Sequence, residues 1–473
     1  MVFSTLTFLY YFLPAALILY FISPSKLKNT ALLIASLVFY AWGEPKYIIL
    51  MITSILIGYA SGLLIERFRE KKKTARAVLI ASTALSLGAL GYFKYSGFFV
   101  ENLNALTGLD FTFKKVALPV GISFYTFQIL SYVVDVYRKD VKAQRNPIDL
   151  GAYVSMFPQL IAGPIVRYSD VDDALRQRAH SFVNAAKGVR RFVCGLAKKV
   201  LLANTAGAMY ELMTETVSST PNFVAAWLGI VFFAFQIYFD FSGYSDMAIG
   251  IALILGYRFM DNFDSPFKSQ NPTEFWRRWH ISLSSWLRDY LYIPMGGSRS
   301  GRLRSRLNLL NTMVIGGLWH GASWMFLIWG AWNGLLLILH KELKAIFTFK
   351  LFYNSFKNTR KVFNIIITFT LISFGMIFFR AGSMEQVNDM LTQIFSNFHL
   401  SVAPQFISGY TMITLTIIVA LVLHFSPHKW TISLQEKYIK MPTLIQGIVL
   451  AAVIFLIIQV RQSDIVPFIY LQY

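Results

Sequence analysis

Apolar residues run along most of this chain in continuous stretches of about twenty, and polar residues gather in short segments between them. Stretches of this kind cover residues 6–22, 30–42, 47–65, 77–95, 119–136, 223–257, 309–339, 362–379, 410–424 and 443–460. About twenty apolar residues form a helix long enough to cross a bilayer, whereas spanning strands would alternate apolar and polar positions. The pattern predicts an all-α polytopic membrane protein folded as a single domain over residues 1–473.

Four segments depart from a simple series of spans. Residues 150–164 are apolar but short and interrupted by proline and glycine, which predicts a re-entrant or interfacial helix. Residues 180–199 are amphipathic and should lie at the membrane surface. Residues 223–257 are long enough for a span and a second partial helix. Residues 309–339 are expected to form a helical hairpin or a broken helix.

Composition and charge fix the class of protein more firmly. Hydrophobic residues make up 55% of the chain and charged residues 14%, against about 25% in soluble domains. The formal net charge of +20 comes largely from Lys and Arg in short loops such as ERFREKKKTAR, the distribution typical of cytoplasmic loops rather than of a nucleic-acid interface. Counting spans from these loops predicts both termini on the outer face of the cytoplasmic membrane, with the first apolar stretch retained as a span. The single cysteine excludes an intrachain disulfide.

Two histidines stand between tryptophans in the segments FWRRWHISLSSW and GGLWHGASW. His320 lies inside an apolar stretch, where an ionisable side chain is costly and indicates a site, and imidazole suits a general base near neutral pH. A hydrogen-bonded structural histidine between helices is the alternative for His320. If the segment around His280 is one helix, Trp276, His280 and Leu283 share a face, and an interfacial anchoring helix is the alternative there.

The neighbouring segments supply charge and polar groups. Residues 260–306 are rich in arginine and should cover a cytoplasmic or re-entrant mouth. Asp240 and Asp246, within YFDFSGYSDM, are candidates for orienting a histidine or pairing with an arginine. The sequence contains no G-x-S-x-G elbow, P-loop or dinucleotide fingerprint. No metal site is expected, because the two histidines are far apart in the chain and belong to no close cluster of metal ligands.

Three long blocks of the chain resemble the membrane-bound O-acyltransferase (MBOAT) family. They are QIYFDFSGYSDMAIGIALILGYRFMDNFDSPF, TEFWRRWHISLSSWLRDYLYIPMGG and GGLWHGASWMFLIWGAWNG. MVFSTLTFLYYFLP, LPVGISFYTFQILSYVVDVYR and FPQLIAGPIVR are similar to the subfamily that acetylates alginate. The resemblance implies a ring of tilted helices and re-entrant helices around a central funnel, with a catalytic core over residues 110–345.

The resemblance also implies a site and a reaction. His320 matches the family's catalytic histidine and His280 its second functional one, while FIYLQY resembles a C-terminal motif whose tyrosine relays the acyl group, here Tyr470 in an outer-face tail over residues 462–473. Leu471 and Tyr473 stand where that motif has phenylalanines. Cytoplasmic acetyl-CoA is the expected donor, with no permanently bound cofactor, and its phosphates are assigned from charge to Arg277, Arg278 or Arg288. The expected partner is an extracytoplasmic SGNH-type transferase or esterase that acetylates a polysaccharide. Membrane lipids are expected to surround the protein, and no nucleic acid is expected to bind it.

Other functions fit parts of this pattern. Peptidoglycan O-acetylation, or D-alanyl transfer to teichoic acid from a carrier protein, would keep the enzyme class and change the donor or the polymer. A transporter or flippase would bind cargo at its polar midplane residues, but such folds are typically built from two similar halves, and the sequence has no such internal symmetry.

Overall fold

A computed structural model describes residues 3–113, 116–219, 223–299, 301–346, 357–396 and 411–460. Every regular element in these ranges is a helix, as the apolar pattern predicts. The helices group into two compact units. The first holds residues up to Phe192 together with Tyr244–Asp261, and the second holds Val193–Gly243 and the described residues from Asn262 onward. Each unit is described by itself.

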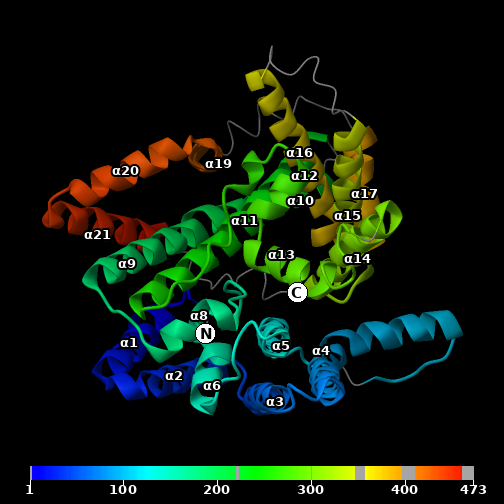
Figure 1. The fold of residues 1–473 in the computed structure, drawn as a ribbon. Helices are drawn as coiled ribbons and strands as arrows, with labels where there is room; N and C mark the ends of the chain where they lie inside the picture. The colour runs from blue at the N-terminus through cyan, green and yellow to red at the C-terminus, as the bar shows by residue number, and fades with distance from the viewer. Residues whose placement is uncertain are drawn as a thin grey trace. The chain divides into compact units, whose positions relative to one another are not determined.

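The first unit is built on three helices that contact one another, α3 (Ile48–Arg67), α4 (Lys72–Thr107) and α5 (Ile122–Arg138). Before them the chain forms a π-helical turn, η1 (Thr7–Phe12), continuous with α1 (Leu13–Ile22), then a short 3₁₀ turn η2 (Ser25–Leu27) and α2 (Lys28–Gly43). Glu44 and Pro45 separate α2 from α3, as predicted. The short helices α6 (Pro147–Ser155), α7 (Phe157–Leu160) and α8 (Tyr168–Arg176) also belong to this unit, and Figure 1 labels α6 and α8.

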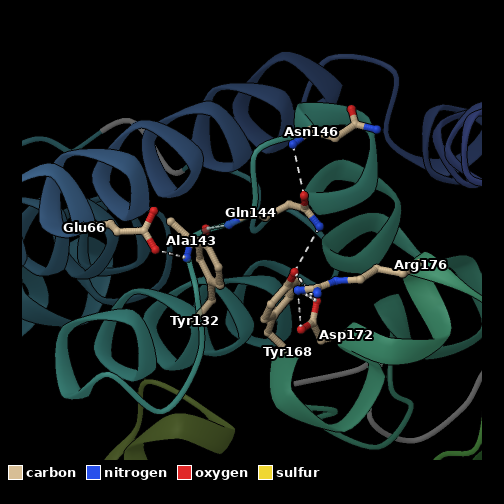
Figure 2. A network of polar contacts seen from close by, with 8 residues as sticks. All are labelled: Glu66, Tyr132, Ala143, Gln144, Asn146, Tyr168, Asp172 and Arg176. Atoms are coloured by element: carbon tan, nitrogen blue, oxygen red, sulfur yellow. Dashed lines mark hydrogen bonds and ion pairs between the residues drawn. The ribbon is translucent and has the colours of Figure 1, made fainter.

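A polar network holds the loop between α5 and α6 against three helices (Figure 2). The backbone N–H of Gln144 donates to the Tyr132 hydroxyl at 2.9 Å, and the Gln144 side-chain amide donates to the Tyr168 hydroxyl at 3.0 Å. Tyr168 in turn donates to Asp172 at 2.7 Å, and Glu66 accepts from the backbone of Ala143 at 3.1 Å. The loop is therefore fixed by hydrogen bonds to groups that are themselves partly buried, which favours one rigid conformation.

Helices α9 (Phe182–Ala197) and α11 (Phe223–Ile254) have residues in both units. In the first unit they cross at Gly188 and Gly250, where a β-carbon on Gly188 would lie 2.5 Å from the Gly250 carbonyl oxygen. Close by, Arg191 donates to Asp246 at 2.9 Å and pairs with Asp261 at 2.5 Å. Pairing with an arginine was one of the roles predicted for Asp246, and that prediction is confirmed.

The second unit contains the remaining helices. Their bounds are η3 (Lys198–Ala203), α10 (Asn204–Ser219), η4 (Pro266–Lys268), α12 (Pro272–Arg278), α13 (Ile281–Leu287), η5 (Arg288–Tyr292), α14 (Arg302–His320), α15 (Trp324–Ile346), α16 (Lys357–Arg380), α17 (Met384–Ser396), α19 (Thr411–Phe425), α20 (His428–Lys440) and α21 (Thr443–Val460). Helices α14 and α15 form the predicted hairpin, with a break at residues 321–323 (Figure 1). Helices α17 and α20 were not predicted, because their apolar positions are spaced along one face rather than continuous.

Four described helices are long and apolar enough to cross a membrane: α3, α4, α11 and α16. The expectation of a second partial helix within residues 223–257 is wrong, since α11 is one uninterrupted helix of 32 residues. The polar segment of α11 causes no break in the helix. In the most apolar part of α11, 67% of the residues are buried within the protein, so polar side chains there face protein partners.

Candidate active site

His320 is the last residue of α14 and is 6% exposed. Rings surround its imidazole on several sides: the ring centroids of Trp329 and Phe379 lie 5.1 and 5.2 Å away at steep angles, and Phe326 lies 6.4 Å away and nearly parallel. Phe326 and Trp329 come from α15 and Phe379 from α16. The helix stops at His320 because Gly321 continues in an extended conformation, which leaves the histidine at the turn of the hairpin rather than within a helix.

The hairpin that carries His320 is closed by direct backbone contact. A β-carbon on Gly317 would lie 2.2 Å from the carbonyl oxygen of Phe326, and one on Gly330 would lie 2.5 Å from that of Met313. Glycine allows α14 and α15 to approach this closely, as small residues do in membrane helix pairs. At the other end of the hairpin, Arg306 pairs with Glu342 at 2.7 Å. Both ends of α14 are thus fixed against α15.

His280 is fully buried and lies at the sharp junction between α12 and α13. It has φ 42° and ψ 56°, a left-handed conformation uncommon for a residue other than glycine. The segment around His280 is therefore two helices rather than one, and Trp276, His280 and Leu283 share no helical face. Strained backbone of this kind is frequent at functional sites, where the surrounding structure holds it in place.

Asn262 determines how the imidazole of His280 is oriented. Its side-chain oxygen accepts from the backbone N–H of Ser282 at 3.1 Å and from the Ser282 hydroxyl at 2.9 Å, which identifies this atom as the oxygen of the amide. The same oxygen lies 3.2 Å from Nδ1 of His280. Because an amide oxygen only accepts, Nδ1 carries the proton and Nε2 carries the lone pair. Burial also lowers the pKa of His280 to about 3, so the ring is neutral at physiological pH.

The two histidines contact the same tryptophan. The ring of Trp319 lies 6.0 Å from that of His280 and 5.0 Å from that of His320. The ring of Phe241 also packs against His280, with 4.6 Å between the ring centroids. The structure therefore brings both predicted histidines into one aromatic cluster, although forty residues separate them in the chain. The cluster is buried and aromatic, and electrostatic interactions with a reacting group are stronger in such a low-dielectric environment than in water.

A buried ion pair lies elsewhere on α11. Lys199 of the π-helical turn η3 and Asp240 lie 2.5 Å apart, and each side chain is 3% exposed. Asp240 thus pairs with a lysine rather than with the arginine or histidine expected. Lone buried charges are costly, and pairing is the usual way in which a membrane protein keeps them.

The three arginines assigned to donor phosphates all lie near α12 and α13. Arg278 donates to Glu274 at 3.0 Å and to Asp264 at 3.2 Å, and Arg288 donates to the adjacent Asp289 at 2.6 Å. Arg277 is exposed on the last turn of α12. Tyr470 and the tail lie outside the described residues.

A cavity of about 540 Å³ adjoins the aromatic cluster within the second unit. Its apolar wall includes Phe233 and Ile377, and Phe233 lies 6.4 Å from Phe379, the ring that packs on His320. Its polar residues are Tyr210, Glu211, Thr214, Glu215, Arg380, Gln386 and Asp389. The rings of Phe233 and Phe379 thus stand between this cavity and His320.

Reasoning from the sequence did not single out Asn262 or Phe379. Asn262 lies eighteen residues before His280, at the end of the first block that resembles the family, where nothing distinguishes it from its neighbours. Phe379 ends an ordinary apolar stretch. Their roles arise from packing between elements distant in the chain, for which the sequence offers no local signal.

Comparison with known proteins identifies relatives over most of the chain. The profile of the MBOAT, membrane-bound O-acyltransferase family matches residues 138–382. A probable alginate O-acetylase of Pseudomonas aeruginosa is 43% identical over 400 residues, 84% of this chain and 75% of the relative. A peptidoglycan O-acetyltransferase of Helicobacter pylori is 36% identical over 83% of this chain and 79% of its own. A teichoic acid D-alanyltransferase of Streptococcus thermophilus is 26% identical over 47% of this chain and 56% of its own.

Proposed function

Because this chain belongs to the membrane-bound O-acyltransferase family and is therefore a multi-pass membrane O-acyltransferase, we propose that it transfers acetyl groups from acetyl-CoA towards an exported polysaccharide of the alginate type. The observation that carries the proposal is the aromatic cluster that joins His280 to His320 through Trp319, within the residues that the family profile matches. Acetyl is favoured over D-alanyl because the relatives named for acetyl transfer are more similar and cover more of the chain.

The proposed chemistry is an acyl transfer with a histidine as base. An acceptor hydroxyl gives its proton to the imidazole of His320 while its oxygen attacks the thioester carbonyl, and the C–S bond then breaks to release the CoA thiolate, which takes up the proton. General-base catalysis of this kind contributes roughly 10² to 10⁴ in rate. His280 is neutral and carries its lone pair on Nε2. It would accept a hydrogen bond from a reacting group in the same cluster and so orient that group.

We further propose that the donor approaches from the cytoplasm and that the acetyl group leaves on the opposite side. Loops rich in Lys and Arg support this topology, which puts both termini outside the cytoplasmic membrane. Arg277, Arg278 and Arg288 are proposed to meet the donor phosphates. Arg277 suits this role best, because carboxylates already hold Arg278 and Arg288. Tyr470 would first receive the acetyl group as an aryl ester and then pass it to an SGNH-type partner.

The test is a labelling experiment. The purified protein is incubated with radiolabelled acetyl-CoA and digested, and the label is located in wild type, His320→Ala and Tyr470→Phe. Label on the tail peptide that is absent from both variants supports the donor, the base and the relay together. Binding of acetyl-CoA without label contradicts the relay and leaves direct transfer to the partner, and absence of binding contradicts acetyl-CoA as the donor.

A further inference from the structure

Three basic side chains meet around one tyrosine in the first unit, far along the chain from either histidine of the candidate active site. The Lys28 ammonium lies 4.8 Å from the centre of the Tyr20 ring, and the Arg178 guanidinium lies 5.5 Å from it. Arg178 also donates to the Tyr20 hydroxyl at 3.1 Å, and Nε2 of His180 lies 3.0 Å from the same oxygen. The Tyr20 hydroxyl donates to the carbonyl oxygen of Leu255 at 2.7 Å, which fixes the ring between these basic groups.

The described residues supply no carboxylate within ion-pair distance of these groups. Arg178 donates to the side-chain oxygen of Asn29, and the amide nitrogen of Asn29 donates to Asp149 at 2.6 Å, so an amide stands between the guanidinium and the nearest bonded carboxylate. Burial and the Arg178 charge lower the pKa of Lys28, and burial, Lys28 and Arg178 lower the pKa of His180. Among the described residues, the cluster thus gathers positive charge without a direct ion pair to a carboxylate.

A purely structural tie between these segments would not need this arrangement. Arg178 alone links α1, α2 and the chain before α9, because it donates to Tyr20 and to Asn29. It also stacks on the Tyr257 ring at 4.8 Å. Bringing Lys28 to the same tyrosine adds like-charge repulsion without adding a hydrogen bond to that tie. Several cations held close together without a carboxylate are the arrangement that binds phosphate oxygens.

The surroundings of the cluster are apolar and exposed. Ile18, Phe21 and Ile22 of α1 are 61%, 47% and 74% exposed, and Leu27 is 52% exposed. Phe21 belongs to both features, because Lys28 lies 5.3 Å from its ring and it also packs against His180. An apolar helix surface that ends in basic groups matches the boundary between acyl chains and headgroups in a bilayer.

We propose that Lys28, Arg178 and His180 form a binding site for the phosphate of an anionic phospholipid, with its acyl chains lying along Ile18 and Ile22 of α1. The Lys28 ammonium and the Arg178 guanidinium take the phosphate oxygens, and the His180 ring lines the site beside them. The exposed apolar side chains favour a lipid over a soluble phosphate. Occupancy by lipid would neutralise the cluster and hold α1, α2 and the segment before α9 together. The site is independent of the acyl donor.

The test compares lipid binding by full-length variants purified in a neutral detergent. Short-chain phosphatidylglycerol is titrated against wild type, Lys28→Gln and Arg178→Gln, with short-chain phosphatidylcholine as the neutral headgroup. Lys26→Gln is the matched control, because Lys26 is exposed two residues away in η2 and makes none of these contacts. Each charge near a membrane surface contributes about 1 kcal/mol, so Lys28→Gln should bind phosphatidylglycerol about fivefold more weakly than wild type. Lys26→Gln should bind it with wild-type affinity.

Three outcomes overturn the proposal. Equal affinity of Lys28→Gln and wild type for phosphatidylglycerol removes the role of the cluster. If wild type binds phosphatidylcholine as tightly as phosphatidylglycerol, the charge of the headgroup has no role. Competition by inorganic phosphate at the affinity of the lipid assigns the site to a soluble phosphate instead. Because Arg178→Gln removes hydrogen bonds to the fold, Arg178→Lys is measured beside it: the charge-conserving variant should retain more lipid affinity than Arg178→Gln.

Discussion

Replacing Gly317 by alanine should separate α14 from α15 and displace His320, three residues further along the same helix. The added β-carbon would lie 2.2 Å from the carbonyl oxygen of Phe326, whereas real β-carbons essentially never approach a neighbour within 3.0 Å. The two backbones must therefore separate by about 0.8 Å at this point. The obstructing atom is part of the backbone, so no change of rotamer relieves the clash.

The size of the effect follows from that displacement. Misplacing a reacting group by about 1 Å costs on the order of 10² in rate, so acetyl transfer should fall by roughly that factor if His320 is the base. Overpacking of a tight contact costs about 1–3 kcal/mol in stability, which should appear as a lower melting temperature. The rate loss should persist at temperatures well below that melting temperature, because it comes from geometry rather than from unfolding.

The assay measures acetyl transfer from labelled acetyl-CoA and thermal unfolding in the same detergent. Gly91→Ala is the matched control: Gly91 lies in α4, and a β-carbon there meets nothing within 4 Å. Alanine is favoured over glycine in a helix by up to about 1 kcal/mol, so the control should be neutral or slightly stabilised. Wild-type activity and stability in Gly317→Ala would refute the view that backbone contact between these helices sets the position of His320.

Three further predictions concern buried polar groups. Asp240→Ala should destabilise the protein by about 3–5 kcal/mol, because it leaves the Lys199 charge buried without its partner carboxylate. Adding Lys199→Met should recover much of that stability in thermal unfolding, and an equal loss in the single and the double variant would contradict the prediction. The folded-state pKa of His280, about 3, lies below the ordinary value of 6.5, so the unfolded chain binds the proton more readily, and stability should fall as pH drops from about 6.5 towards 3. The fall should be shallower in His280→Gln, and equal slopes would count against burial as the cause. Asn262→Leu should lower the rate of transfer more than it weakens donor binding, because Asn262 orients His280 rather than holding substrate, and a change in binding alone would contradict that role.

The sequence predicted the helical class, most of the apolar helices and the hairpin at the WHGA segment, because each depends on continuous apolar stretches or on local glycine. It did not predict the junction at His280, since the left-handed backbone there is held by Asn262, eighteen residues away. Nor did it predict that Asp240 pairs with Lys199. Lys199 lies in the π-helical turn η3, and the geometry of that turn sets which of its side chains meet α11. Long-range packing decided each of these features.

The hairpin has a consequence for how acyl specificity can evolve. Backbone contacts between α14 and α15 fix His320, whereas the rings that face it, Phe326, Trp329 and Phe379, are side chains that can be exchanged one at a time. Substitutions at these rings can enlarge or reshape the space for the acyl group without moving the histidine. A family that contains proteins named for acetyl transfer and for D-alanyl transfer could therefore diversify its donors through side-chain size alone, with the position of the base left unchanged.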